Sequence, residues 1–182
     1  MSRIIIPRNT LVVLCGPAGC GKSTFAARHF SRTEVISSDE CRALVSDDPA
    51  DQSASRDAFE LMHFIIEKRL KRRCLTVADA THLQRDARRH LTRIARANAF
   101  NTAAVVFNVP LSVCLSRNRR RARAIPEDAL ARQHKMLGAT LETVGKEGFD
   151  FLFFLDETTQ SRVRIEVTRR TRRNPRSSAP RQ

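Results

Sequence analysis

Short blocks of apolar residues alternate along the chain with longer segments in which apolar positions recur at helical spacing. The blocks that predict strands lie at residues 11–15, 34–37, 74–79, 102–109 and 149–155. The first block is apolar at every position, which is typical of a strand covered on both faces of a parallel sheet. The alternation of strands and helices therefore predicts an α/β fold, a parallel sheet with helices on both faces.

The segments between these blocks carry apolar positions three and four residues apart, which predicts helices. The expected helices cover residues 22–30, 39–45, 52–72, 84–97, a segment from residue 111, 126–137 and 139–146. We expect the arginines of the helix 84–97 on its surface. Residues 1–10 are interpreted as a short lead-in and the alternating segment 162–167 as an edge strand or short terminal segment. Residues 1–168 are interpreted as one domain.

The loop after the first predicted strand fits the pattern Gly-x-x-x-x-Gly-Lys-Ser at residues 16–23. A buried strand precedes it and a helix follows it, which is the context that a phosphate-binding loop requires. Its N–H groups attract phosphate, Lys22 is expected to reach the β- and γ-phosphates, and Ser23 is expected to bind Mg²⁺. The residues expected to bind ATP or another NTP are Gly16, Gly19, Gly21, Lys22, Ser23 and Thr24.

An acidic residue follows the second predicted strand. Asp39 lies where a doubly wound sheet places ligand-contacting groups, at the carboxyl end of a strand. A carboxylate there is suited to accept a proton from a hydroxyl that attacks the γ-phosphate. Arg42 falls on the same face if a helix begins near Ser38, and an acid beside a cation suits a phosphorylated acceptor. From spacing alone, a helix-capping Asp39 with a surface Arg42 is an equally good interpretation.

A second acid, Asp79, ends the third predicted strand. In folds with a phosphate-binding loop, such a carboxylate holds Mg²⁺ through water or orients the serine of the loop. Asp79 therefore competes with Asp39, and we assign Asp39 as the base and Asp79 as a supporting group. The acidic loop 46–51 is interpreted as a cap for the helix near Gln52, with metal binding or the positioning of an arginine as alternatives.

Arginines gather after the fourth predicted strand. A helix that begins near Leu111 would place Arg117 and Arg121, four residues apart, on one face. Guanidinium groups there fit an arginine-bearing helical lid, which closes over the triphosphate and neutralises charge on the transferred phosphoryl group. A solvated basic helix face is the alternative interpretation.

Net charge is the unusual feature of the composition. The 182 residues include 33 Lys and Arg against 19 Asp and Glu, or +14 at pH 7, and such a surface should attract polyanions, nucleic acid first. Six arginines lie in residues 169–182, a tail without acids that we expect to be disordered and to contact a phosphate backbone. An arginine-favouring genome is the alternative explanation of the charge.

Five cysteines without a Cys-x-x-Cys pair indicate neither a zinc site nor a disulfide framework, so we expect reduced thiols and a cytoplasmic location. No stretch approaches the roughly 18 consecutive apolar residues of a membrane-spanning helix, and the N-terminus has too short an apolar run for a secretory signal. We therefore expect a protein that neither spans a membrane nor is exported. The sequence does not indicate an oligomeric state.

Several stretches match one family when they are taken together. They are residues 16–24, 33–39 with Cys41 and Arg42, 46–48 with Asp51 and Gln52, 75–81, 105–110, and Arg117-Asn118 with Arg121. The Ser-Ser-Asp-x-Cys-Arg and Asp-Ala-Thr stretches are far more specific than the loop, which a very large superfamily shares. On these residues, and over positions 4–168, the chain resembles the kinase module of the bacterial polynucleotide kinase-phosphatase-ligase repair family and, more distantly, the phage polynucleotide kinases.

The resemblance implies a P-loop kinase that transfers the γ-phosphate of an NTP, with Mg²⁺, to 5′-OH ends of RNA or DNA. The matching positions are Lys22 and Ser23 for the phosphates and magnesium, Asp39 for the general base, Arg42 and Gln52 for the acceptor, and Arg117 and Arg121 for the lid. The resemblance thus favours catalysis over capping for Asp39 and Arg42. No stretch matches the metallophosphatase or adenylyltransferase modules of longer members, so we expect phosphorylation alone.

Two other functions are consistent with the same sequence. A small-molecule kinase could use this scaffold, although a neutral small acceptor does not call for a net charge of +14. A non-catalytic protein that binds nucleic acid and uses the loop as an NTP-dependent switch is the other alternative.

Overall fold

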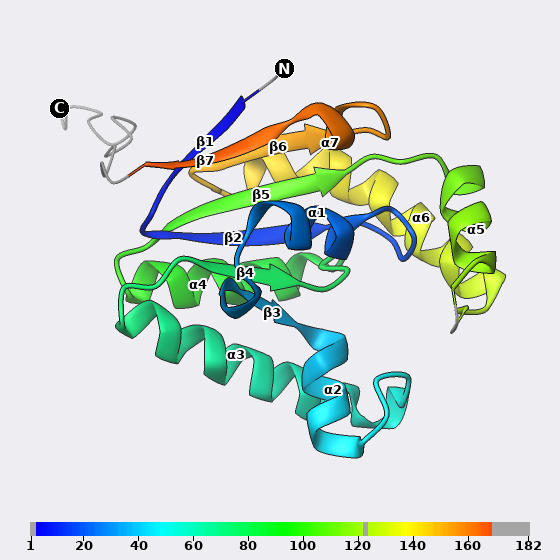
Figure 1. Cartoon of the computed structure of the whole chain (residues 1–182), viewed down its shortest axis with the longest axis horizontal. Coiled ribbons are helices and arrows are strands. Elements are labelled where there is room, and N and C mark those ends of the chain that lie inside the picture. Colours follow the sequence, from blue (N-terminus) through cyan, green and yellow to red (C-terminus); the bar gives the residue numbers. More distant parts are fainter. Residues whose placement is uncertain (1–2, 122–123, 169–182) are drawn as a thin grey trace, which may run out of the picture.

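The computed structural model describes residues 3–121 and 124–168, and its centre is a parallel sheet of five strands (Figure 1). The strands lie in the order β3-β4-β2-β5-β6. Their bounds are Thr10–Cys15 (β2), Val35–Ser37 (β3), Thr76–Asp79 (β4), Asn101–Phe107 (β5) and Phe151–Leu155 (β6). All neighbouring pairs are parallel, so the five predicted strands and the predicted fold class are confirmed.

The register of the sheet brings the ends of three strands to one level. Leu14 of β2 lies opposite Asp79 of β4, and Asp79 lies opposite Ser37 of β3. The phosphate loop at residues 16–23, Asp39 and Asp79 therefore meet at the same edge. Because β2 lies between β4 and β5, this edge is the switch point at which an open α/β sheet binds its ligand.

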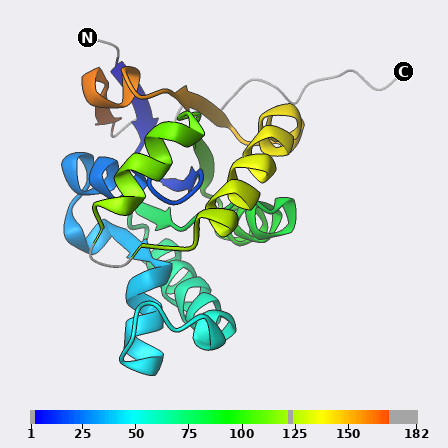
Figure 2. The same ribbon diagram turned by 90° about the vertical axis from the view of Figure 1, so that its right-hand side faces the viewer.

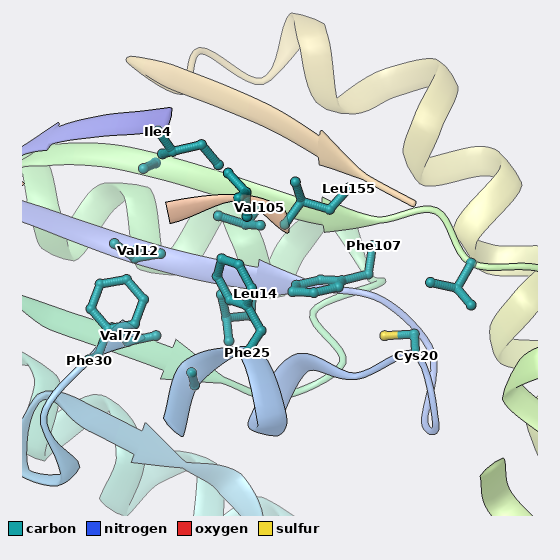
Figure 3. Close-up of a cluster of buried hydrophobic side chains, with 14 of the residues drawn as sticks. Ile4, Val12, Leu14, Cys20, Phe25, Phe30, Val77, Val105, Phe107 and Leu155 are labelled. Carbon is teal, nitrogen blue, oxygen red and sulfur yellow. The ribbon is translucent and has the colours of Figure 1, made fainter. Parts of the chain in front are cut away.

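Helices cover both faces of the sheet (Figures 1 and 2). They are α1 (Lys22–His29), α2 (Ser38–Ser46), α3 (Ser55–Lys71), α4 (Arg85–Ala97), α5 (Leu111–Arg119), α6 (Glu127–Thr143) and α7 (Thr159–Arg162), with 3-10 turns η1 (Arg32–Glu34), η2 (Gln52–Ala54) and η3 (Val144–Lys146). Val12 and Leu14 of β2 pack with Phe25 of α1 (Figure 3), whereas Val13 and Cys15 pack on the side of α3 and α4. Every residue of β2 is therefore buried, as its apolar run predicted.

The two ends of the described chain form a separate two-stranded sheet. β1 (Arg3–Pro7) pairs in parallel with β7 (Arg164–Thr168), which confirms a terminal strand near the predicted position. Ile4 and Ile6 of β1 are buried in the core on the α1 side. The interpretation of residues 1–10 as a lead-in is therefore wrong, because the partner strand lies at the other end of the chain and no local pattern reveals it.

Two predicted helix boundaries are also wrong. The predicted break at Gly138 does not occur, and α6 continues through it with open space beside the glycine. One glycine costs a helix about 1 kcal/mol, and burial of the neighbouring Leu137 opposes that cost. The helix α5 ends at Arg119, so Arg121 lies beyond its last turn and not on one helical face with Arg117.

Arg88 of α4 is buried, contrary to the expectation that the arginines of this helix lie on the surface. Its guanidinium forms a two-pronged ion pair with Glu147, with Nε 2.8 Å from Oε2. Nη1 donates to the carbonyl oxygens of His82 and Leu83 at 2.8 and 2.9 Å and to the Thr140 hydroxyl at 3.3 Å. This one side chain therefore joins α4, α6, the end of η3 and the segment after β4.

Within residues 3–121 and 124–168, no helix is long and apolar enough to cross a membrane. All five cysteines are free. The segment 169–182, which we predict to be disordered, lies outside the described residues.

Replacing Arg88 with Met is expected to lower the free energy of unfolding by about 3–5 kcal/mol, because it leaves the Glu147 carboxylate buried without a partner. Adding Glu147→Leu removes the second charge and should recover part of that loss. Urea unfolding at pH 7 measures both variants. Arg89→Met, on the exposed side of the same helix, is the control and should stay within about 0.5 kcal/mol. A loss below about 1 kcal/mol for Arg88→Met would contradict this role.

Candidate active site

A cleft of about 690 Å³ opens at the edge of the sheet where β2, β3 and β4 end. The phosphate loop and α1 form one wall, α2 and the start of α3 form another, and residues of α5 and α6 line the remaining side. The predicted site residues that line it are Gly19, Gly21, Lys22, Ser23, Thr24, Asp39, Arg42, Gln52, Asp79, Arg117 and Arg121. Of the predicted set, only Gly16 is outside the lining.

Two glycines give the phosphate loop its shape. Gly19 and Gly21 have φ of +76° and +104°, in the left-handed region that favours glycine. A Cβ at Gly19 would lie 2.6 Å from the backbone oxygen of Cys114 in α5, and one at Gly21 would lie 2.5 Å from Oε1 of Gln160. The loop thus packs directly against the backbone of α5 at Gly19 and against the Gln160 side chain of α7 at Gly21.

Lys22, the first residue of α1, is buried with its ammonium group folded over the loop. Its Nζ donates to the carbonyl oxygens of Gly16 and Pro17, both at 2.8 Å. The positive charge is therefore held at the mouth of the loop, where it is placed to neutralise phosphate oxygens.

The segment after β4 supports the phosphate loop from behind. The N–H of Gly16 donates to the carbonyl oxygen of Thr81 at 2.9 Å, which explains why Gly16 anchors the loop and does not line the cleft. Nδ1 of His82 donates to the carbonyl oxygen of Leu14 at 2.9 Å. Burial lowers the pKa of His82 to about 4, so the ring is neutral at pH 7.

Ser23 and Asp79 form the part of the site that is suited to magnesium. The Ser23 side chain lies beside the buried Asp79 carboxyl, whose pKa is raised by burial against the opposing effects of Ser23 and Lys22. Among the described residues, no group of three or more His, Cys, Asp or Glu could hold a metal ion. Mg²⁺ in phosphate sites keeps several waters and uses one or two protein oxygens together with the phosphates, so a hydroxyl beside a carboxylate fits this ion.

Asp39 and Arg42 form an ion pair on the opposite wall. Ser37 caps α2 by accepting a hydrogen bond from the Asp39 N–H at 3.3 Å, which places Asp39 in the first turn. Arg42, one turn later and only 5% exposed, donates from Nη1 to Asp39 Oδ1 at 2.8 Å and to the Pro49 carbonyl oxygen at 2.9 Å. Its Nε is buried with no hydrogen-bond partner in the described residues, whereas the Asp39 side chain is 63% exposed. An exposed carboxylate therefore lies beside a largely buried cation.

Gln52 begins the turn η2 on the same wall and is exposed. Its Nε2 donates to the carbonyl oxygen of Ala50 at 3.2 Å. Asp51, the residue before it, caps this turn by accepting from the Ser53 N–H at 2.9 Å. The predicted capping role of the acidic loop is thus confirmed at Asp51.

Arg117 lies over the phosphate loop on the third side of the cleft. Its Nη1 donates to the Cys20 carbonyl oxygen at 3.4 Å, and its Nη2 lies 3.1 Å from Oε1 of Glu157. Arg121 is exposed and also lines the cleft, although it follows the end of α5. Both predicted lid arginines therefore reach the same space.

The polar residues of the cleft that no sequence motif predicted include Gln133, Glu157 and Gln160. Gln133 of α6 accepts a hydrogen bond from the Ala18 N–H at 2.8 Å, and Gln160 of α7 covers Gly21. None of them belongs to a motif, and only the packing of α6 and α7 near the phosphate loop brings them to the site.

Residues 11–143 match the family model AAA_33, described as an AAA domain. No curated protein sequence matches the chain. Among solved structures, the chain is similar to one in the Pnkp1/Rnl/Hen1 RNA repair complex, with 24% identity and a TM-score of 0.65 over 80% of this chain. It spans about half of that protein, 48% of its length.

Small-molecule kinases are similar over most of their length. A gluconokinase from Sinorhizobium meliloti 1021 has 20% identity and a TM-score of 0.52, over 83% of this chain and 84% of its own. A shikimate kinase from Acinetobacter baumannii, in complex with shikimate, has 17% identity and a TM-score of 0.53, over 82% and 86%. At these identities the likeness concerns the fold, which is that of P-loop kinases and implies nucleotide binding. The chain, matched over most of its length by the family model, belongs to the AAA_33 family of AAA domains.

Proposed function

We propose that the protein is a Mg²⁺-dependent polynucleotide 5′-hydroxyl kinase, which transfers the γ-phosphate of ATP or another NTP to 5′-OH ends of RNA or DNA. The observation that carries the proposal is the Asp39–Arg42 pair, which faces the phosphate loop across the cleft. A base beside a cation is what a phosphorylated alcohol requires as an acceptor, because the carboxylate takes the hydroxyl proton and the guanidinium binds the adjacent phosphate.

The reaction follows from these positions. Asp39 accepts the proton of the attacking hydroxyl, whose oxygen forms a bond to the γ-phosphorus while the bond to the β–γ bridging oxygen breaks and the nucleoside diphosphate leaves. Arg42, beside Asp39 in the wall of the cleft, holds the acceptor phosphate, and Gln52 contacts the acceptor nearby. Lys22, Arg117 and Arg121 neutralise the charge that spreads over the transferred group.

Ser23 and Asp79 are the residues that would hold the magnesium ion, Ser23 directly and Asp79 through water. The ion would neutralise charge on the phosphates of the donor. Ser23 lies beside Asp79, so the hydroxyl and the carboxylate would support the ion together.

Charge and similarity both support a nucleic-acid acceptor. The chain carries a net charge of +14, which favours a polyanionic substrate. The similar protein of the Pnkp1/Rnl/Hen1 complex belongs to an RNA repair assembly. The free cysteines suit a reducing compartment, and we propose a cytoplasmic location.

A kinase for a small alcohol is the second candidate. It is supported by the gluconokinase and the shikimate kinase, since the chain covers more than four fifths of each and only about half of the RNA repair protein. The two candidates share the donor site and differ in what Asp39 and Arg42 bind.

A panel of acceptors separates the candidates. With Mg²⁺ and ATP labelled in the γ-phosphate, we expect transfer to 5′-OH RNA or DNA oligonucleotides and none to the same oligonucleotides with a 5′-phosphate. Transfer should fall steeply with added salt, because counterion release drives the binding of nucleic acid. If gluconate, shikimate or a nucleoside 3′-phosphate is phosphorylated better than any oligonucleotide, this result favours the small-molecule candidate instead.

Asp39→Asn is expected to lower kcat for transfer by about 10²–10⁴-fold, because the amide accepts no proton but still bonds Arg42. Affinity for ADP should not change, since Asp39 lies across the cleft from the loop. Initial rates with a 5′-OH oligonucleotide and calorimetric titration with ADP measure the two quantities. Asp86→Asn, the same change at an exposed residue of α4, is the control. Transfer at the wild-type rate by Asp39→Asn would refute the role of the base.

Asp79→Asn is expected to unfold at a higher temperature than the wild type at pH 7 without ligands. Burial raises the pKa of Asp79 above its unfolded value, so the stability of the wild type is greater when the group is protonated and falls as pH rises above that value. The difference in unfolding temperature between the two proteins should shrink as the pH falls toward 4. At pH 7 with Mg²⁺ and ATP added, the difference should reverse, because the variant loses a group that supports the ion. Stabilisation by Mg²⁺ and ATP equal to that of the wild type would contradict this prediction.

A further inference from the structure

Gln133 is the residue of α6 that touches the phosphate loop. The backbone N–H of Ala18 donates to its Oε1 at 2.8 Å, across 115 positions of sequence. The side chain lines the cleft and is half-buried. The contact is therefore part of the donor site and not a surface bond between distant elements.

This hydrogen bond determines how the Gln133 amide is oriented. Because the Ala18 N–H is a donor, only the amide oxygen can pair with it, so Nε2 occupies the other position. Nε2 has no hydrogen-bond partner among residues 3–121 and 124–168. The side chain thus contributes two unused N–H donors beside the loop.

The Lys22 ammonium group lies close to the part of the loop that Gln133 contacts. Its Nζ bonds the carbonyl oxygen of Pro17, the residue next to Ala18. In phosphate-binding loops this lysine reaches the β- and γ-phosphates, whereas the α- and β-phosphates lie on the N–H groups of the loop. Gln133 and Lys22 therefore contact neighbouring residues of the loop, which places Gln133 on the side where the lysine is expected to meet the outer phosphates.

We propose that Gln133 binds the γ-phosphate of the donor, with Oε1 on the Ala18 N–H and Nε2 donating to a γ-phosphate oxygen. Gln133 then distinguishes a triphosphate from a diphosphate. It also links occupancy of the γ-phosphate position to α6, the helix that follows the lid arginines. The inference rests on the nucleotide-binding part of the proposed function and does not depend on which acceptor is used.

The test compares two variants of Gln133 with a matched control. Gln133→Glu keeps an oxygen for Ala18 but replaces the N–H donors with negative charge, and Gln133→Leu removes both functions. Gln84→Leu makes the same change at an exposed glutamine outside the cleft. Calorimetric titration with Mg²⁺ and either ADP or a non-hydrolysable ATP analogue gives the two affinities.

Both Gln133 variants should bind the ATP analogue at least about tenfold more weakly than the wild type, which is the effect of losing one charge-assisted hydrogen bond. Their affinity for ADP should stay within about twofold, and this binding also shows that each variant is folded. Gln84→Leu should match the wild type with both ligands.

A role in supporting the loop alone would produce a different result. Gln133→Glu would then keep the wild-type ratio of the two affinities, and Gln133→Leu would weaken ADP and the analogue equally. Either result overturns the proposal. The titrations contain no acceptor. Failure of the wild type to phosphorylate 5′-OH ends would therefore refute the proposed function but would leave these nucleotide affinities unchanged.

Discussion

The edge of the sheet that carries the candidate active site depends on the ion pair and hydrogen bonds of the buried Arg88 guanidinium. An uncompensated charge in a protein interior costs several kcal/mol, so this side chain is tolerated only where its donors find partners. Glu147 supplies the opposite charge, and His82, Leu83 and Thr140 supply the remaining oxygens. The need to satisfy one arginine thus determines how α4 and α6 meet the segment after β4.

The segment after β4 connects Arg88 to the phosphate loop through hydrogen bonds. His82 has φ of +42°, an uncommon conformation for a residue other than glycine, and its carbonyl and ring are both held, by Arg88 and by Leu14. Beside it the Thr81 carbonyl oxygen receives the Gly16 N–H at the start of the phosphate loop. The donor side is therefore preorganised by buried hydrogen bonds. The opposite wall, formed by α2 and the start of α3, is held by the contacts of Arg42 with Asp39 and Pro49, and the Asp39 side chain stays largely exposed.

Sequence patterns predicted the parts of the fold and site that local chemistry determines. The apolar run before Gly16 and the motif at 16–23 are read directly from neighbouring residues, and Asp39 and Asp79 lie at the carboxyl ends of two predicted strands. Arg88 has the same local pattern as the surface arginines of its helix, so burial could not be inferred from it. Gln133 belongs to no motif at all, because its role depends on how α6 crosses the phosphate loop.

Asp39 and Asp79 stand at the ends of adjacent strands and could exchange roles on the evidence of sequence alone. Their environments differ in the structure. Asp79 is buried beside Ser23 and Lys22, the residues predicted to contact magnesium and phosphate, and burial raises its pKa. Asp39 is largely exposed beside Arg42, where an acceptor hydroxyl can approach it. Because a base must reach its proton directly, this difference in access supports Asp39 as the base and Asp79 as the group that supports magnesium.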